Sequence, residues 1–141
     1  MATEILVNDG GAPARIMNLG NANAAIEAGM FVDINSSGKI IAATDDQEAS
    51  SSGEKVSLGV LLVDAVAGAP TSIITGKGIV CNVQAAESIT VGQELTTDDA
   101  GKVEPTADAD AHRAVAIALA ASFSGTDSSG NATTFVKVLL I

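Results

Sequence analysis

Apolar and polar residues alternate along most of the chain, in short runs separated by glycine-containing turns. The turn at residues 35–38, Asn-Ser-Ser-Gly, lies between Val32 and Ile34 on one side and Ile40 on the other. Alternation on both sides of a short turn predicts a β-hairpin. Glycine suits such turns because it adopts a positive φ without steric cost.

The same reasoning predicts further strands along the chain. Two more turns have apolar residues on both sides and predict hairpins: residues 98–101 between Leu95 and Val103, and residues 76–78 between Ile73 and Ile79. The last segment, residues 133–141, is rich in β-branched side chains and predicts a strand that closes a sheet. Residues 4–7 and 15–17 also predict strands, joined by a flexible segment at residues 8–11.

One pattern of glycine, lysine and apolar positions occurs twice. The corresponding positions lie 63 residues apart: residues 26–29 and 89–92, Gly38 and Gly101, Lys39 and Lys102. Each copy continues through an acidic stretch into an apolar segment that ends at a glycine, Gly68 in the first copy and Gly125 in the second. These two glycines are only 57 residues apart, so the second copy is six residues shorter in this part. The repeat carries no catalytic group, which favours a β unit that serves for shape and contact.

The apolar segments are ambiguous between strand and helix when they are taken singly. Residues 114–121 have a helix-forming composition, whereas residues 59–63, their counterparts, are rich in β-branched side chains. The duplication therefore favours strands for both. Elsewhere, residues 21–28 are compatible with one or two helical turns.

These patterns predict a mainly β fold with two duplicated small lobes, of the β-barrel or β-tulip kind, and an extended N-terminal arm. We expect the arm and first strands in residues 1–22, the first repeat in residues 23–83 and the second in residues 84–141. A chain of 141 residues accommodates all three parts in one compact domain.

The composition excludes several classes of partner. Seventeen acidic and seven basic residues give a net charge of −10, and such a surface repels nucleic acid and anionic membranes. Three phenylalanines are the only aromatic residues, too few for a platform that stacks bases or sugars. The N-terminus lacks the features of a signal peptide, and the longest apolar run, residues 114–121, is too short to span a bilayer. We therefore expect a soluble protein.

Candidate catalytic and metal-binding residues are sparse. Cys81 and His112 are the only residues of their types, so a disulfide within the chain, a zinc site and a Cys–His dyad all lack partners. Residues 33–38 match the first half of a calcium loop, but Thr44 stands where a bidentate glutamate is needed. A hairpin turn is the favoured interpretation there. Four further acidic residues are interpreted as solvated loop residues: Asp98, Asp99, Asp108 and Asp110. No metal, cofactor or enzymatic activity is expected.

The repeated positions and several further short motifs follow one another in a distinctive order along the chain. The further motifs are Gly59-Val60, Ala67-Gly68, Gly76 and Gly78, Ala116-Ile117-Ala118 and residues 136–140. This order resembles that of the capsid decoration proteins of tailed viruses (bacteriophages or archaeal viruses), also called head-stabilising or cement proteins. The segment from Val32 to Leu61 is also similar to the head decoration protein of lambda-like phages. The resemblance covers about residues 26–141.

The resemblance implies a structural virion protein on the outer capsid surface, commonly a homotrimer, that bridges neighbouring major capsid proteins and stabilises the shell. Members of the family often join a capsid-protein sheet through an N-terminal arm. The matching residues here are Ala2, Thr3, Glu4, Ile5, Leu6 and Val7, which alternate and would add a strand to an exposed edge. The alternative is that residues 2–7 pair within their own fold.

Two other functions are compatible with parts of the sequence. A tail, spike or adhesin-type β module of a virion or cell surface would share the duplicated lobes but bind a different partner. An enzyme or a carrier of small ligands is disfavoured, because the chain lacks a paired base and nucleophile and has few aromatic residues to line a pocket.

Overall fold

The computed structural model describes residues 2–7, 13–44, 57–106 and 114–141. These residues form a nearly all-β structure that contains no α-helix in the described ranges. The strands are β1 (Arg15–Met17), β2 (Phe31–Ile34), β3 (Ile40–Ala42), β4 (Gly59–Leu61), β5 (Ile73–Thr75), β6 (Val80–Gln84), β7 (Glu94–Thr97), β8 (Val103–Pro105), β9 (Ala116–Ala118), β10 (Phe123–Thr126) and β11 (Ala132–Leu140).

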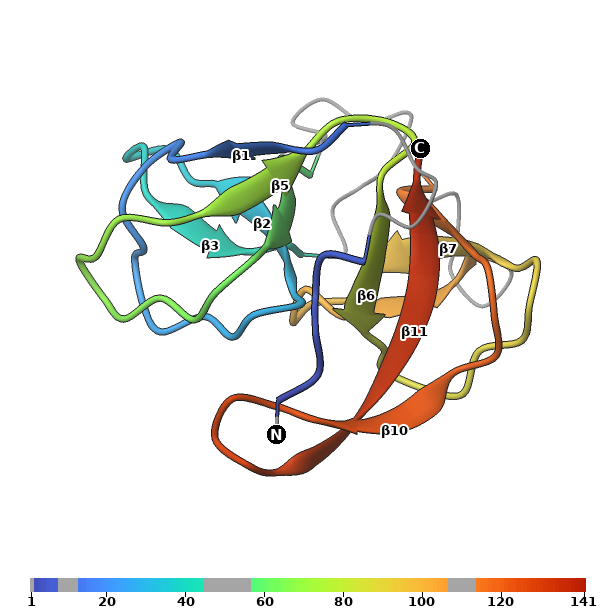
Figure 1. Ribbon diagram of the computed structural model, residues 1–141. Helices are drawn as coiled ribbons and strands as arrows, with labels where there is room; N and C mark the ends of the chain where they lie inside the picture. Colours follow the sequence, from blue (N-terminus) through green and yellow to red (C-terminus); the bar gives the residue numbers. More distant parts are fainter. Residues whose placement is uncertain (1, 8–12, 45–56, 107–113) are drawn as a thin grey trace.

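The strands form two antiparallel sheets, one in each lobe. The first sheet has the order β1-β5-β4-β2-β3. The second has the order β10-β11-β9-β7-β8, with β6 paired to β11. Figure 1 shows the two lobes next to each other, the first in blue to green and the second in olive to red. The mainly β, two-lobed prediction is confirmed, but neither sheet closes into a barrel within the described residues.

The strand registers follow the sequence repeat. The β2–β3 hairpin pairs Val32 with Ala42, and the β7–β8 hairpin pairs Leu95 with Pro105, each residue 63 positions further along. Both predicted hairpins are therefore confirmed. The predicted strands at residues 59–63 and 114–121 are confirmed as β4 and β9. They pair with β2 and β7 in equivalent registers.

The two hairpin turns close through the same side-chain contact. Asn35 Oδ1 accepts hydrogen bonds from the main-chain N–H groups two and four residues further on, both at 2.9 Å. Asp98 Oδ1 accepts the equivalent bonds at 2.8 and 2.9 Å. Gly38 and Gly101 both have φ of 76°, a conformation that glycine adopts freely. Each copy thus specifies its turn locally.

The predicted hairpin across residues 76–78 is wrong. β5 pairs within the first sheet, whereas β6 pairs with β11 of the second. The turn at Gly76 and Gly78 instead carries the chain between the lobes, and Gly78 N donates to Leu140 O at 2.7 Å. The physical reason is that β6 forms five residue pairs with β11, and β6 would lose these pairs if it formed a hairpin with β5.

The helical turns considered for residues 21–28 are also absent from the structure. Ile26 instead exchanges two main-chain hydrogen bonds with Ala65, at 2.9 and 3.0 Å. Ala22 N donates to Ala69 O at 2.8 Å. Pairing with the segment that follows β4 therefore replaces the local hydrogen bonds of a helix.

The two sheets share one hydrophobic core. Phe31 and Val60 of the first sheet belong to the same buried cluster as Val138 of the second. The neighbouring residues Val32 and Leu61 belong to a separate cluster inside the first lobe. Because side chains alternate along a strand, β2 and β4 bury one face against the second lobe and the other within their own lobe.

The lobes meet at one turn glycine from each copy of the repeat. Phe31 N donates to Gly101 O at 2.9 Å, and a Cβ at Gly101 would lie only 2.7 Å from Phe31 O. Gln84 N donates to Gly29 O at 2.9 Å. The other copies of these glycines, Gly38 and Gly92, would have nothing within 4 Å of an added Cβ. Identical turns therefore occupy different environments, one buried and one open.

This difference gives a matched pair of substitutions. Gly38→Ala and Gly101→Ala both place a Cβ at a φ of 76°, which costs about 1–2 kcal/mol. Gly101→Ala also forces the new methyl group against Phe31 O, which adds about 1–3 kcal/mol of packing strain. Urea unfolding should therefore show the larger loss of stability for Gly101→Ala. Equal losses would contradict the close approach of the two lobes at this turn.

Candidate interaction surface

Residues 2–7 lie beside β6, along an edge of the second sheet (Figure 1). Asn82 N donates to Ile5 O at 2.8 Å, and Val7 N donates to Val80 O at 3.2 Å. Leu6 forms the antiparallel bridge to β6 that lies between these two hydrogen bonds. The N-terminal segment thus pairs within its own chain in this structure, and its role as a capsid-binding arm remains a prediction.

Polar contacts hold the start of the segment. Thr3 N donates to Thr126 O at 2.8 Å, and Thr126 N donates to Thr3 Oγ1 at 2.9 Å. Asn82 Nδ2 donates to Glu4 O at 2.8 Å, so Asn82 binds the segment through both its main chain and its side chain. The side chains of Ala2 and Glu4 are exposed.

Ile5 anchors the segment in the shared core. Its side chain is 7% exposed and belongs to the cluster that includes Phe135. A Cβ at Gly29 would lie 3.2 Å from both of these side chains, so the glycine of the first copy leaves room for them. Leu6 packs against the same cluster.

Cys81 lies in β6 directly opposite Leu6. Its side chain is fully buried, and burial raises the pKa of the thiol to about 12. A thiol with such a pKa carries little thiolate at neutral pH and is a poor nucleophile. Cys81 is therefore a core residue.

Sequence reasoning missed the role of Asn82, although the chain contained a signal for it. Asn18 directly follows β1 and lies 64 residues before Asn82 in the sequence. β1 pairs with β5 as β6 pairs with β11, with Ile16 opposite Ile74 and Val80 opposite Leu139. The two asparagines thus occupy equivalent places at the edges of the two sheets.

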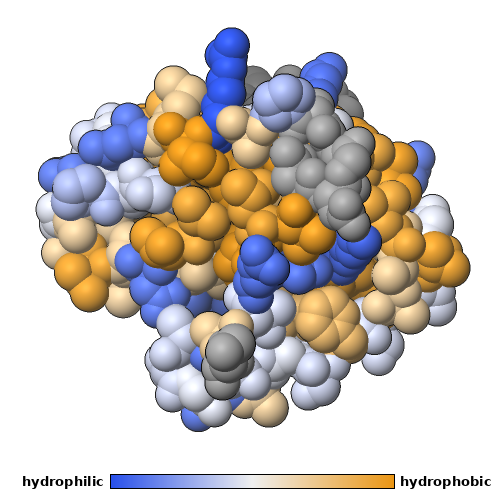
Figure 2. Space-filling view, viewed as in Figure 1, coloured by the Kyte–Doolittle hydropathy of each residue, from blue (hydrophilic) through white to orange (hydrophobic). Residues whose placement is uncertain are grey.

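Several large apolar side chains are exposed at the surface. Among the described residues, nine large hydrophobic side chains are exposed: Ile16, Met17, Ile34, Val63, Val66, Val91, Leu119, Phe123 and Ile141. Figure 2 shows a hydrophobic band across the middle of one face, with hydrophilic residues around it. Extended apolar surface on a chain this acidic is typical of a protein that binds other proteins.

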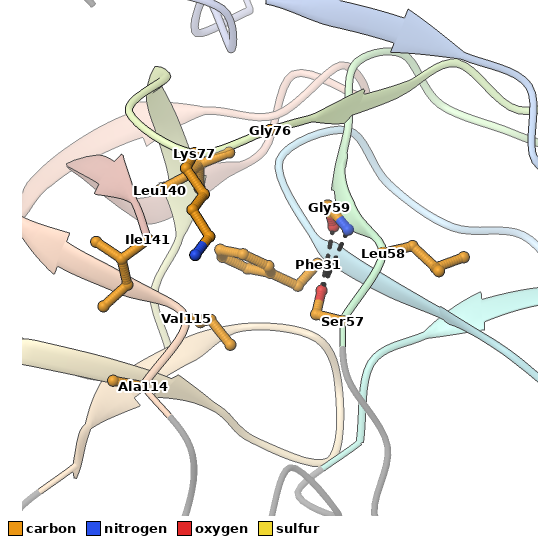
Figure 3. A pocket seen from close by; sticks show the side chains of 10 residues that line it. All are labelled: Phe31, Ser57, Leu58, Gly59, Gly76, Lys77, Ala114, Val115, Leu140 and Ile141. Atoms are coloured by element: carbon orange, nitrogen blue, oxygen red, sulfur yellow. Dashed lines mark hydrogen bonds between the residues drawn. The ribbon is translucent and has the colours of Figure 1, made fainter. Parts of the chain in front are cut away.

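A cavity of about 230 Å³ lies between the lobes (Figure 3). Phe31 and Val115 contribute to its apolar lining, and the side chain of Lys77 reaches into it from the turn after β5. Ser57 Oγ lies within hydrogen-bond distance of Val32 O and of the main chain of Gly59. The described residues of the lining include no acid–base pair and no activated nucleophile.

A second hollow, of about 340 Å³, lies between residues 2–5, the loop after β4 and the β10–β11 turn. Asp64 connects the two lobes beside it, because its side chain accepts hydrogen bonds from Ala28 N, at 2.7 Å, and from Ser128 Oγ. This hollow therefore belongs to the contact between the N-terminal segment and both lobes.

Within the described ranges, no group of three or more histidine, cysteine, aspartate or glutamate residues could hold a metal ion. Residues 33–38 form the predicted hairpin turn, and Asp98 closes the other one. Asp108, Asp110 and His112 lie outside the described residues. The described part of the chain also contains no helix that is long and apolar enough to cross a membrane.

A family model for phage cement proteins matches residues 12–138 of the chain. The chain belongs to the phage cement protein family. Membership indicates a structural virion protein that associates with the capsid. No curated protein matches the chain.

Among solved structures, the head fibre gp8.5 N base of bacteriophage phi29 has a similar fold. The TM-score is 0.63 at 17% sequence identity, over 92% of this chain and 95% of that chain. At this identity the likeness concerns the fold.

The contact between the N-terminal segment and β6 can be tested through Cys81. Deletion of residues 2–7 removes the hydrogen bonds to β6 and the buried side chain of Ile5, so the edge beside Cys81 should open more often. We expect a thiol reagent at pH 8 to modify Cys81 at least about tenfold faster in the shortened chain. Ile5→Ala, which keeps the main chain, should give a smaller increase.

The rate at which Cys81 is modified in urea, where the chain is unfolded, gives the upper limit for both the intact and the shortened chain. A shortened chain that is modified as slowly as the intact one would show that residues 2–7 do not protect the edge.

Proposed function

We propose that the chain is a non-enzymatic cement protein that binds the outer surface of the assembled capsid and bridges neighbouring major capsid proteins. The family match over residues 12–138 carries this proposal. The exposed apolar side chains, the sparse chemistry of the cavities and the net charge of −10 support a protein that acts by contact with other proteins. Bridging would reinforce the shell against the pressure of packaged DNA.

Residues 2–7 are the proposed capsid-binding arm. They are held to β6 mainly by a few main-chain hydrogen bonds and by Ile5, so an exchange onto the edge of a capsid-protein sheet would replace these bonds with equivalent ones. We also propose a homotrimer. Three arms on one particle would bind jointly, and such multivalency multiplies modest affinities by roughly 10² to 10⁴.

The likeness to the phi29 head fibre base favours one alternative. The fold would then serve as an attachment base for a fibre or spike, and would bind the capsid without reinforcing it. The two functions differ in what binding does to the shell, because only a cement protein raises the temperature at which the shell disrupts.

We expect the intact chain to cosediment with capsids that lack it, saturating at a fixed ratio to the major capsid protein. Binding should raise the disruption temperature of the shell, measured by light scattering. Removal of residues 2–7 should weaken binding at least about tenfold if the arm provides one of the contacts.

Saturable binding without a change in disruption temperature would favour the attachment base. If no intact shell bound the chain, the capsid function would be wrong. Full binding after the deletion would contradict the role of residues 2–7 as an arm and leave the capsid-binding proposal intact, provided that circular dichroism shows the shortened chain to be folded.

The homotrimer predicts a particle of three 14.0 kDa chains. Sedimentation velocity should detect it either in free solution or, after gentle release, from decorated shells. A chain that is monomeric in both conditions would contradict the trimer without affecting the capsid-binding proposal.

A further inference from the structure

The duplication gives the molecule two equivalent sheet edges, one at β6 and the other at β1. β6 pairs with β11 on one side and receives the N-terminal segment on the other. β1 pairs with β5 on one side, in the equivalent register. In the described ranges, no strand pairs with the outer side of β1, which forms the upper border of the first lobe in Figure 1.

The contact at β6 shows what this kind of edge binds. Val80 O and Asn82 N hold the extended segment through its main chain. By the strand register, the equivalent groups of the first lobe are Ile16 O and Asn18 N, and they point away from β5. Asn18 is the same residue type as Asn82, whose side-chain Nδ2 donates to the main chain of Glu4. Asn18 Oδ1 accepts from Gly20 N at 3.2 Å within its own lobe, so its Nδ2 is the group equivalent to that of Asn82.

The edge of β1 also has the surface of a binding site. Ile16 and Met17 are 45% and 42% exposed, next to groups that can extend the sheet. Unpaired edges with apolar side chains accept further strands, and proteins commonly protect them with charges or proline. Arg15 is the only charged residue in this strand.

We propose that the β1 edge, residues 15–18, binds an extended segment of the major capsid protein by strand addition. This inference rests on the proposed capsid function and adds a second attachment point to it. A capsid-protein segment is favoured over residues 4–7 of a second copy, because that segment pairs with its own β6 in this structure and with a capsid protein in the proposed arm exchange, so it is occupied in both cases. The occupant would be extended, with an apolar side chain opposite Met17, as Leu6 lies opposite Cys81.

Bridging requires this kind of arrangement. One chain can connect two capsid proteins only if it contacts both, and the arm and the β1 edge belong to different sheets. The arm would donate a strand to one capsid protein, and the β1 edge would accept a strand from another.

The test compares two lysine substitutions in the full chain. Ile16→Lys places a charge on the β1 edge. Ile34→Lys places one at the end of β2 in the same sheet, where the side chain is 43% exposed. We expect Ile16→Lys to weaken cosedimentation with undecorated capsids at least tenfold and Ile34→Lys to change it less than twofold, with thermal unfolding of both close to that of the wild type.

Hydrogen exchange supplies an independent measurement on the unaltered chain. On shells, the amides of Ile16 and Asn18, which point away from β5, should exchange at least tenfold more slowly than in the free chain, while those in residues 35–38 should keep their free rates. Protection is expected because strand addition engages main-chain groups.

Other outcomes would overturn the proposal. If wild-type protein binds shells and Ile16→Lys binds equally well, without protection of residues 15–18, the edge is not the attachment point. If Ile16→Lys changes the sedimentation coefficient of the free protein, the edge binds a second copy. If wild-type protein fails to bind shells, the capsid function itself is wrong, and the proposal is wrong with it.

Discussion

The structure depends on the sharing of one core by two small sheets. Most strands are only three to five residues long, and a sheet of such strands is stable only when another layer covers its apolar face. Phe31 and Val60 of the first sheet pack in one buried cluster with side chains of the second lobe, which covers this face. The repeat is therefore a structural necessity, because each copy supplies the layer that the other one lacks.

Sharing a core makes the two copies unequal. Gly38 and Gly101 have the same φ and close the same type of turn, but only Gly101 lies against the neighbouring lobe. The edges differ in the same way, since the N-terminal segment covers β6 and no described strand covers β1. A single chain cannot fill both edges with one segment. The duplication thus yields one edge that pairs with the chain's own N-terminal segment and one that no described strand covers.

The accuracy of the sequence predictions follows the range of the interactions involved. The two confirmed hairpins depend on contacts within four residues, such as those of Asn35 Oδ1, and the local sequence specifies them completely. The turn at residues 76–78 also contains the expected glycines, but its partner strands are chosen by distant residues of β11. A turn motif indicates where a chain changes direction and does not indicate which sheet it enters.

The predictions for the candidate site likewise succeeded where local sequence decides the structure and failed where distant residues decide it. Alternation in residues 4–7 predicted an extended segment, since strand periodicity is a local property. That this segment lies on β6 depends on Asn82, a residue far from it in sequence. Only the 64-residue spacing from Asn18 to Asn82 carried this information, and it acquires meaning once the strand registers relate β1 to β6.

If the proposed arm and β1 edge both attach to the capsid, their short length would restrict binding to assembled shells. An edge of three or four residues offers two or three main-chain hydrogen bonds, each worth about 0.5–1.5 kcal/mol net. One such contact cannot offset the loss of translational and rotational freedom on association, which is about 4–15 kcal/mol. Two contacts on each chain, multiplied within an oligomer, can offset it only when the capsid lattice presents their partners at fixed spacing. In the proposed function, weak edges would therefore make binding conditional on assembly, since the lattice would supply the multivalency that the isolated partner lacks.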